Sequence, residues 1–99
     1  MAFEVSEQNK QKIIALISVI IPEAKIYLFG SRARGKNAEW SDIDLALDIG
    51  HQIAQLSMIE VKDVLEATNL PYKVDVVDMY AISDEMKKLI LKDRVIWKS

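Results

Sequence analysis

The chain has 99 residues, 51% of them hydrophobic and 28% charged, which suits one hydrophobic core and excludes two independent ones. We therefore expect a single domain over residues 1–99. Thirteen basic and fifteen acidic residues give a net charge of -2, which argues against the broad positive field of a nucleic-acid-binding surface. The chain contains no cysteine, which excludes disulfides, thiolate metal sites and thiol catalysis.

The apolar segments indicate neither a membrane protein nor a secreted one. The longest apolar stretch, residues 13–21, is too short to cross a bilayer. The first ten residues, MAFEVSEQNK, lack the basic start and the small-residue cleavage site of a secretory signal. We therefore expect a cytoplasmic protein that makes no contact with a membrane.

The first elements expected along the chain are a helix and a short strand. The helix is predicted over about residues 7–20, with Ser6 as its N-cap and Pro22 at its end. Its apolar residues follow the spacing of one helix face: Ile13, Ile14, Leu16, Ile17, Ile20 and Ile21. Residues 25–29 are mostly β-branched or aromatic and end at Gly30, which predicts a strand.

Residues 42–49 alternate between two kinds of side chain, which is typical of a strand with one buried face. One face carries Ile43, Leu45, Leu47 and Ile49, and the other carries Asp42, Asp44, Ala46 and Asp48. The second face therefore presents a row of carboxylates.

The second half of the chain predicts a helix, a strand and a further helix. The helix is expected over about residues 53–67, the strand over 73–79, and the last helix from its N-cap Ser83 to about Lys92, before a short tail segment at 94–97. The inward positions expected on the two helices are Ile53, Leu56, Ile59, Val64 and Leu65, then Met86, Leu89 and Ile90. This order predicts an α/β or α+β domain with a small sheet.

Asp42 and Asp44 are the first candidates for chemistry. Side chains two residues apart on a strand point the same way, roughly 6 to 7 Å apart at the backbone, so the two carboxylates can converge. Carboxylate oxygens suit Mg²⁺ or Mn²⁺, and a pair of such ions stabilises the attacking and leaving oxygens of a phosphoryl displacement. The alternative for this tripeptide alone is a solvated strand face without function, although aspartate is depleted in strands.

A third carboxylate is expected from the strand at 73–79. Asp75 and Asp78 have opposite parity, so a regular strand cannot direct both to one site. Asp75 is predicted as the third ligand and Asp78 as an edge or cap residue, an assignment that a bulge would reverse. Asp48 lies about 13 Å along its strand from Asp44, which places it out of reach of the metal.

A phosphate-binding turn is predicted at residues 30–35, GSRARG. At the end of a strand, a helical turn would present backbone N–H groups to an anion, and Gly30 would allow close approach. The Ser31 hydroxyl could add a donor, and Arg32 and Arg34 could neutralise phosphate oxygens. A surface loop with solvated arginines is the alternative for this segment alone.

The same segment satisfies G-x-x-x-x-G-K, the phosphate loop of P-loop NTPases. It departs from that motif at Asn37, which replaces the Ser or Thr that binds magnesium. Only residues 37–41 separate Lys36 from the next strand, which leaves no room for the long helix that must follow such a loop. Both departures argue against a P-loop.

Gly30 and Ser31, ten intervening residues, Asp42 and Asp44, and a later strand with Asp75 together resemble the signature of the DNA polymerase β-like nucleotidyltransferase superfamily. Residues 30–48, GSRARGKNAEWSDIDLALD, and the small size of the chain resemble in particular the minimal nucleotidyltransferases, the MNT antitoxins of HEPN ribonuclease toxins. The resemblance extends from the first helix to the helix after the third strand.

The resemblance implies a mixed β-sheet flanked by helices, with Asp42 and Asp44 bridging two Mg²⁺ ions and Asp75 joining the metal that activates the acceptor hydroxyl. By the same analogy, the chain would transfer AMP from ATP to a tyrosine hydroxyl of the partner toxin, with release of pyrophosphate. This reaction would silence the ribonuclease. The chain would then be expected to form a hetero-oligomer with its toxin.

Other residues are assigned by the same resemblance. Gly30 and Ser31 match the triphosphate-binding pair of the family, whereas Arg32 and Arg34 match less constrained positions. The only histidine, His51, matches no catalytic position and is expected to be structural or solvated.

Two other functions stay open on the sequence alone. The chain could be a non-catalytic antitoxin that neutralises its partner by occlusion, or a nucleotidyltransferase for a small molecule or an RNA end. The lack of a second domain and of net positive charge argues against the latter. We therefore expect a partner protein to supply the acceptor.

Overall fold

The computed structural model describes residues 4–99, which form three helices and four strands. In chain order the elements are α1 (Glu7–Ile20), β1 (Lys25–Phe29), β2 (Ile43–Asp48), α2 (Gln55–Ala67), β3 (Val74–Asp78), α3 (Asp84–Asp93) and β4 (Val95–Lys98). The predicted bounds of the first helix and the first strand are confirmed, as are Ser6 and Ser83 as N-caps. The expected order of elements did not include a strand in the tail, which forms β4.

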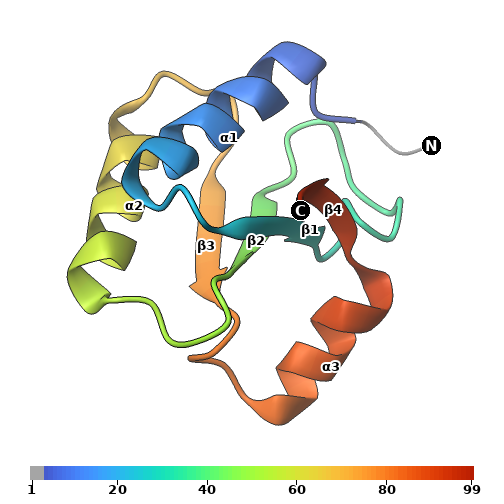
Figure 1. Ribbon diagram of the computed structural model, residues 1–99. Coiled ribbons are helices and arrows are strands. Elements are labelled where there is room, and N and C mark those ends of the chain that lie inside the picture. Colours follow the sequence, from blue (N-terminus) through green and yellow to red (C-terminus); the bar gives the residue numbers. More distant parts are fainter. Residues whose placement is uncertain (1–3) are drawn as a thin grey trace.

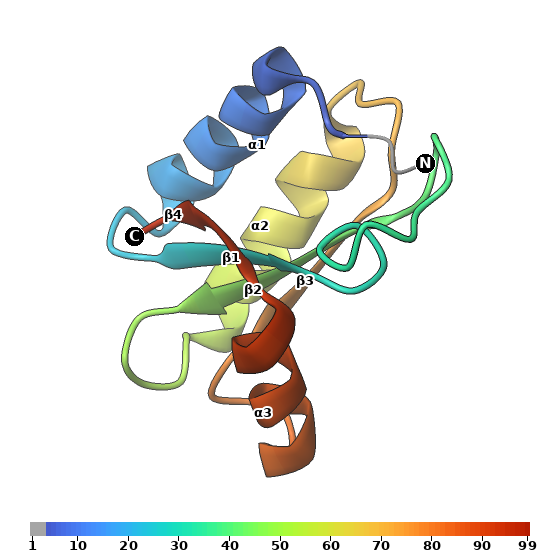
Figure 2. The same cartoon turned by 90° about the vertical axis from the view of Figure 1, so that its right-hand side faces the viewer.

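The four strands form one mixed sheet in the order β3-β2-β1-β4. Strand β1 runs antiparallel to both β2 and β4, whereas β2 and β3 are parallel because α2 carries the chain back between them. Helices α1 and α2 cover one side of the sheet, and α3 lies on the other side (Figure 1, Figure 2). This arrangement confirms the predicted mixed sheet flanked by helices.

The main core lies between the sheet and helices α1 and α2. Alternate residues of three strands face these helices, as expected for half-buried strands. The buried side chains of this core include Ile13 and Ile17 of α1, Ile26 of β1, Ile43, Leu45 and Leu47 of β2, Val61 and Leu65 of α2, and Val76 of β3. No helix within residues 4–99 is long and apolar enough to cross a membrane.

A smaller cluster lies between the other side of the sheet and α3. It contains Tyr27, Ala46, Met79 and Ile90. Ala46 belongs to the strand face that carries Asp44 and Asp48, so α3 covers the middle of this face. Asp44 and Asp48, on either side of Ala46, stay partly exposed.

The helices expose several residues that the periodicity predicted to be inward. On α2, Leu56 is 76% and Ile59 is 47% exposed, and the inward face carries Val61 and Leu65. The apolar residues of α2 lie on more than one face, and only packing against α1 and the sheet selects between them.

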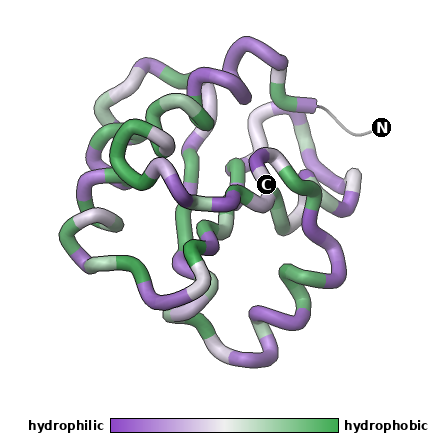
Figure 3. The backbone as a smooth tube through the Cα atoms, in the orientation of Figure 1, coloured by the Kyte–Doolittle hydropathy of each residue, from purple (hydrophilic) through white to green (hydrophobic). Residues whose placement is uncertain are grey.

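On α3, Ile90 is the only buried residue, and Leu89 and Met86 are exposed, which corrects the predicted inward set. Hydrophobic and hydrophilic stretches alternate along α3 in Figure 3. Among the described residues, α3 is the one helix on this side of the sheet (Figure 2). Ile90 alone is buried on this helix, and it packs with Tyr27, Ala46 and Met79 on this side of the sheet.

Candidate active site

Asp44 and Asp75 are direct neighbours on the adjacent strands β2 and β3. The parallel register pairs the Cα atom of Asp44 with that of Asp75. Ile43, Leu45 and Val76, which flank them in sequence, are buried under α1 and α2. Alternation therefore directs both carboxylates to the opposite side of the sheet, so the fold brings these two predicted site residues together.

Asp42 lies one residue before β2, and its side chain is exposed. Its charge nevertheless reaches Asp44. The pKa of Asp44 is raised from its ordinary value, chiefly because its carboxyl is partly buried and also because Asp75 and Asp42 are negatively charged. Among residues 4–99, no three Asp, Glu, His or Cys side chains are close enough to form a ready-made metal site. Asp44 is therefore the centre of an acidic cluster with Asp75 and Asp42, whose negative charges interact although the three side chains do not form a ready-made metal site.

Gly30, directly after β1, lies against the Asp44 carboxylate. Its φ is 76°, a left-handed conformation that favours glycine. A Cβ atom at this position would lie 2.5 Å from Asp44 Oδ2, well inside the ordinary contact distance. The register of β1 and β2 produces this approach, because Phe29 pairs with Asp44. Both the backbone conformation and the available space therefore require glycine here.

The residues after Gly30 fold into a tight turn. The Arg34 N–H donates to the Gly30 carbonyl at 3.2 Å, and the Lys36 N–H donates to the Ser31 carbonyl at 2.9 Å. The first of these bonds closes a single turn of helix. This confirms the helical turn predicted at the end of the strand, whereas its binding of phosphate stays a prediction.

Two basic side chains border the acidic cluster. Arg34 Nη1 lies 3.9 Å from Asp93 Oδ2 of α3, and Lys73 Nζ lies 3.9 Å from Asp75 Oδ1. Both cations oppose the rise in the pKa of Asp44. Such long, exposed ion pairs contribute little to stability, so both cations can exchange partners with an anion. Lys73 was not among the predicted site residues, although its spacing of two from Asp75 could have indicated it.

Arg32 has a different environment from the predicted one. Its side chain is only 8% exposed. The guanidinium donates to the carbonyl oxygen of Ser41 through Nε at 3.0 Å and Nη2 at 2.9 Å, and to that of Glu39 through Nη2 at 2.9 Å. It also lies 4.9 Å from the centre of the Tyr72 ring. These partners hold Arg32 against the following loop, so that its contact with phosphate stays a prediction, whereas Arg34 is the arginine beside the acidic cluster.

Asp78 has the structural role that its parity predicted. It is 5% exposed and accepts hydrogen bonds from the N–H groups of Ile53 at 2.8 Å and Tyr80 at 2.9 Å. It thereby joins the end of β3 to the segment before α2. Asp48 lies at the far end of β2, and His51 is exposed in the loop that follows, so neither belongs to the acidic cluster.

Known proteins share this fold over most of the chain. Residues 10–99 match the family model "Polymerase beta, Nucleotidyltransferase". The chain is 32% identical over 91 residues to the protein adenylyltransferase MntA of Shewanella oneidensis, a match that spans 90% of this chain and 65% of that relative.

Two solved structures are also similar. A toxin-antitoxin complex with AMP-PNP matches with a TM-score of 0.75 and 31% identity, over 90% of this chain and 72% of that one. A tri-AMPylated Shewanella oneidensis HEPN toxin in complex with its MNT antitoxin matches with a TM-score of 0.70 and 28% identity, over 92% and 70% of the two chains.

A mixed sheet that presents neighbouring aspartates beside a glycine turn is the arrangement of a nucleotidyltransferase domain. Because the family model spans residues 10–99, the chain belongs to the polymerase β nucleotidyltransferase family. The similarity to MntA and to MNT antitoxins confirms the resemblance inferred from residues 30–48.

Proposed function

We propose that the chain is a protein adenylyltransferase that moves AMP from ATP to a hydroxyl of a HEPN ribonuclease toxin and so acts as its antitoxin. The observation that carries this proposal is the pairing of Asp44 with Asp75 beside Gly30. Further support comes from the similarity to a protein adenylyltransferase and to complexes that contain AMP-PNP or a tri-AMPylated HEPN toxin. A tyrosine is the acceptor that the family resemblance implies.

Asp42, Asp44 and Asp75 would hold two Mg²⁺ ions, or Mn²⁺ in their place. The residues fit such ions, because hard carboxylate oxygens are their preferred ligands. The repulsion that raises the pKa of Asp44 is also one that a bound divalent cation would remove. When bound, such ions neutralise charge on phosphate oxygens and lower the pKa of an attacking hydroxyl.

The remaining roles follow from the positions of the side chains. Backbone N–H groups of the Gly30 and Ser31 turn would bind the triphosphate, and Arg34 would leave Asp93 to neutralise phosphate oxygens. The acceptor oxygen then bonds to the α-phosphorus of ATP, and the bond from that phosphorus to pyrophosphate breaks. The hydroxyl proton passes to Asp75 or to solvent.

Labelled ATP tests this reaction directly. The chain is incubated with Mg²⁺, a HEPN ribonuclease toxin, and ATP labelled at either the α- or the γ-phosphate. Transfer of the α-label alone is expected. Transfer of the γ-label would indicate a kinase, and stable binding without transfer of either label would indicate an antitoxin that acts by occlusion.

Paired variants of one strand provide the control. Asp44→Asn should abolish transfer, because it removes the central carboxylate of the cluster. Asp48→Asn changes the same residue type at the far end of β2 and should retain transfer. Equal loss in both variants would contradict the proposed site.

A further inference from the structure

Arg32 joins two segments of the chain that lead into different strands. Its hydrogen bonds to the Glu39 and Ser41 carbonyls hold the segment directly before Asp42 and β2. Its contact with the Tyr72 ring reaches the segment directly before β3, three residues from Asp75. The Arg32 guanidinium, which belongs to the turn after Gly30, thus contacts both segments that lead into the strands of the acidic cluster.

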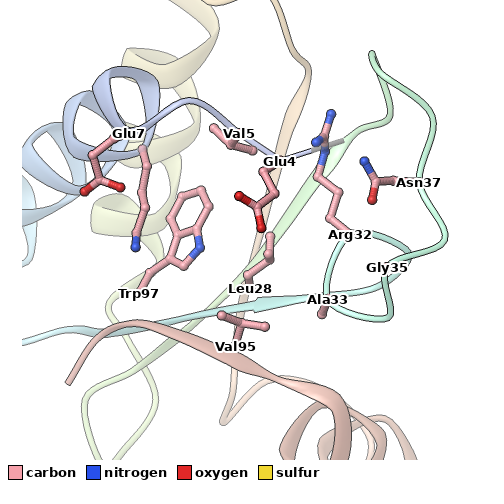
Figure 4. A pocket seen from close by; sticks show the side chains of 11 residues that line it. Glu4, Val5, Glu7, Leu28, Arg32, Ala33, Gly35, Asn37, Val95 and Trp97 are labelled. Carbon is pink, nitrogen blue, oxygen red and sulfur yellow. The ribbon is translucent and has the colours of Figure 1, made fainter. Parts of the chain in front are cut away.

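The Arg32 side chain lies on the helix-covered side of the sheet. It lines a pocket of about 410 Å³ together with Leu28 and Trp97, two residues that pack in the core under α1 and α2. Figure 4 shows it extending from the turn beside Asn37 of the following loop. Asp44 and Asp75 face the other side of the sheet, so the guanidinium lies behind the carboxylate site.

Asp42 is the carboxylate whose placement depends most on this loop. Asp42 precedes β2. The hydrogen bonds between β2 and the β3 segment begin only at the next residue, where the Ile43 N–H donates to the Lys73 carbonyl at 2.9 Å. The chain before it forms a turn in which the Ala38 N–H donates to Ser41 Oγ at 2.8 Å. Arg32 binds the carbonyl of the residue adjacent to Asp42, at the point where this turn meets the strand.

The two segments also contact each other through aromatic rings. The ring centres of Trp40 and Tyr72 lie 5.8 Å apart with the planes tilted by 43°, and Arg32 lies over the Tyr72 ring. Aromatic pairs and cation–π contacts of this kind are individually modest but have defined geometry. Together with the carbonyl bonds they resist relative movement of the segments before β2 and β3.

We propose that Arg32 is a positioning residue for the acidic cluster: by tying the segment before β2 to the segment before β3, it fixes the position of Asp42 relative to Asp44 and Asp75. It does not bind phosphate. The inference rests on the proposed function for the identity of the cation. A guanidinium can bond two carbonyls at once in a planar fork, which a lysine ammonium cannot reproduce. Partners that orient metal ligands typically change metal affinity by about 10- to 100-fold when they are removed.

Mn²⁺ binding by the chain without nucleotide or toxin tests this role apart from activity. Arg32→Lys retains the positive charge and should weaken Mn²⁺ binding, measured by electron paramagnetic resonance, by about 10-fold or more. Arg94→Lys is the matched control, because Arg94 also lies over a tyrosine ring, 4.5 Å from that of Tyr27. It should leave Mn²⁺ binding unchanged.

A kinetic comparison separates positioning from phosphate binding. Arg32→Lys should raise the Mg²⁺ concentration needed for half-maximal AMP transfer and leave the half-saturating ATP concentration unchanged at saturating Mg²⁺. Tyr72→Leu removes the ring without altering the arginine and should shift the Mg²⁺ requirement in the same direction. Tyr72→Phe retains the ring and should behave as the unmodified chain.

Three outcomes would overturn the inference. If Arg32→Lys raises the half-saturating ATP concentration and binds Mn²⁺ normally, Arg32 is a phosphate ligand. If Arg32→Lys and Arg94→Lys weaken Mn²⁺ binding equally, Arg32 has only a general packing role. Failure of the unmodified chain to bind Mn²⁺ would leave no cation site to position. Failure to transfer AMP while Mn²⁺ binds would refute the proposed function and leave the Mn²⁺ comparison valid.

Discussion

The contact of Gly30 with Asp44 can be isolated by comparing Gly30→Ala with Gly50→Ala. Both glycines have positive φ, 76° and 84°, so alanine is strained at either position. A residue other than glycine in this conformation costs about 1–2 kcal/mol of folding free energy. Since each kcal/mol lowers the Tm of a domain of this size by about 4–8 °C, both variants should melt roughly 4–16 °C lower.

Only the Gly30 variant should disturb the carboxylate site. The new Cβ atom would lie 2.5 Å from Asp44 Oδ2, whereas nothing lies within 4 Å of the Cβ position at Gly50. The Asp44 carboxylate must therefore move by about 1 Å to reach ordinary contact distance, and a displacement of that size can lower a reaction rate by about 100-fold. Gly50→Ala should retain AMP transfer.

Melting curves and Mn²⁺ binding without nucleotide test whether Gly30 is the packing partner of Asp44. Gly30→Ala should bind Mn²⁺ more weakly than Gly50→Ala even when no triphosphate is present, which separates displacement of Asp44 from obstruction of the phosphate. Equal Tm values accompanied by equal Mn²⁺ binding and equal transfer would refute the assignment of Gly30 as the packing partner of Asp44.

Three further results are expected. Asp44→Asn should raise the Tm of the ligand-free protein at neutral pH. Because the pKa of Asp44 is raised in the folded protein, protonation of Asp44 stabilises the fold. This stabilisation is complete below the ordinary aspartate pKa and is lost as the pH rises through the pKa of the folded protein. The difference in Tm between Asp44→Asn and the unmodified chain should therefore shrink from pH 7 toward pH 4, and a constant difference would contradict this prediction. Asp78→Ala should lower the free energy of unfolding by roughly 1–3 kcal/mol in urea titration, because the Ile53 N–H loses its buried acceptor. Mg²⁺ with ATP should raise the Tm of the unmodified chain by mass action and should do so much less for Asp44→Asn.

Local regularities of the sequence predicted much of the fold. Helix α1 and strand β1 were located to the residue because a serine N-cap, a proline and a glycine mark their ends. Strand β4 was missed, since four residues at the end of the chain become a strand only by pairing with β1. Leu56 and Leu89 were predicted to be buried but are exposed. Apolar spacing shows which faces of a helix can be buried, and the neighbouring elements decide which of these faces is buried.

The candidate site divides in the same way. Alternation along two strands is a local property, so the sequence alone grouped Asp42 with Asp44 and separated Asp75 from Asp78. Strand register and packing decided the rest. They place Asp75 beside Asp44, Gly30 against the same carboxylate, and the Arg32 side chain on the opposite side of the sheet. These depend on contacts between residues far apart in the chain, which no local pattern encodes.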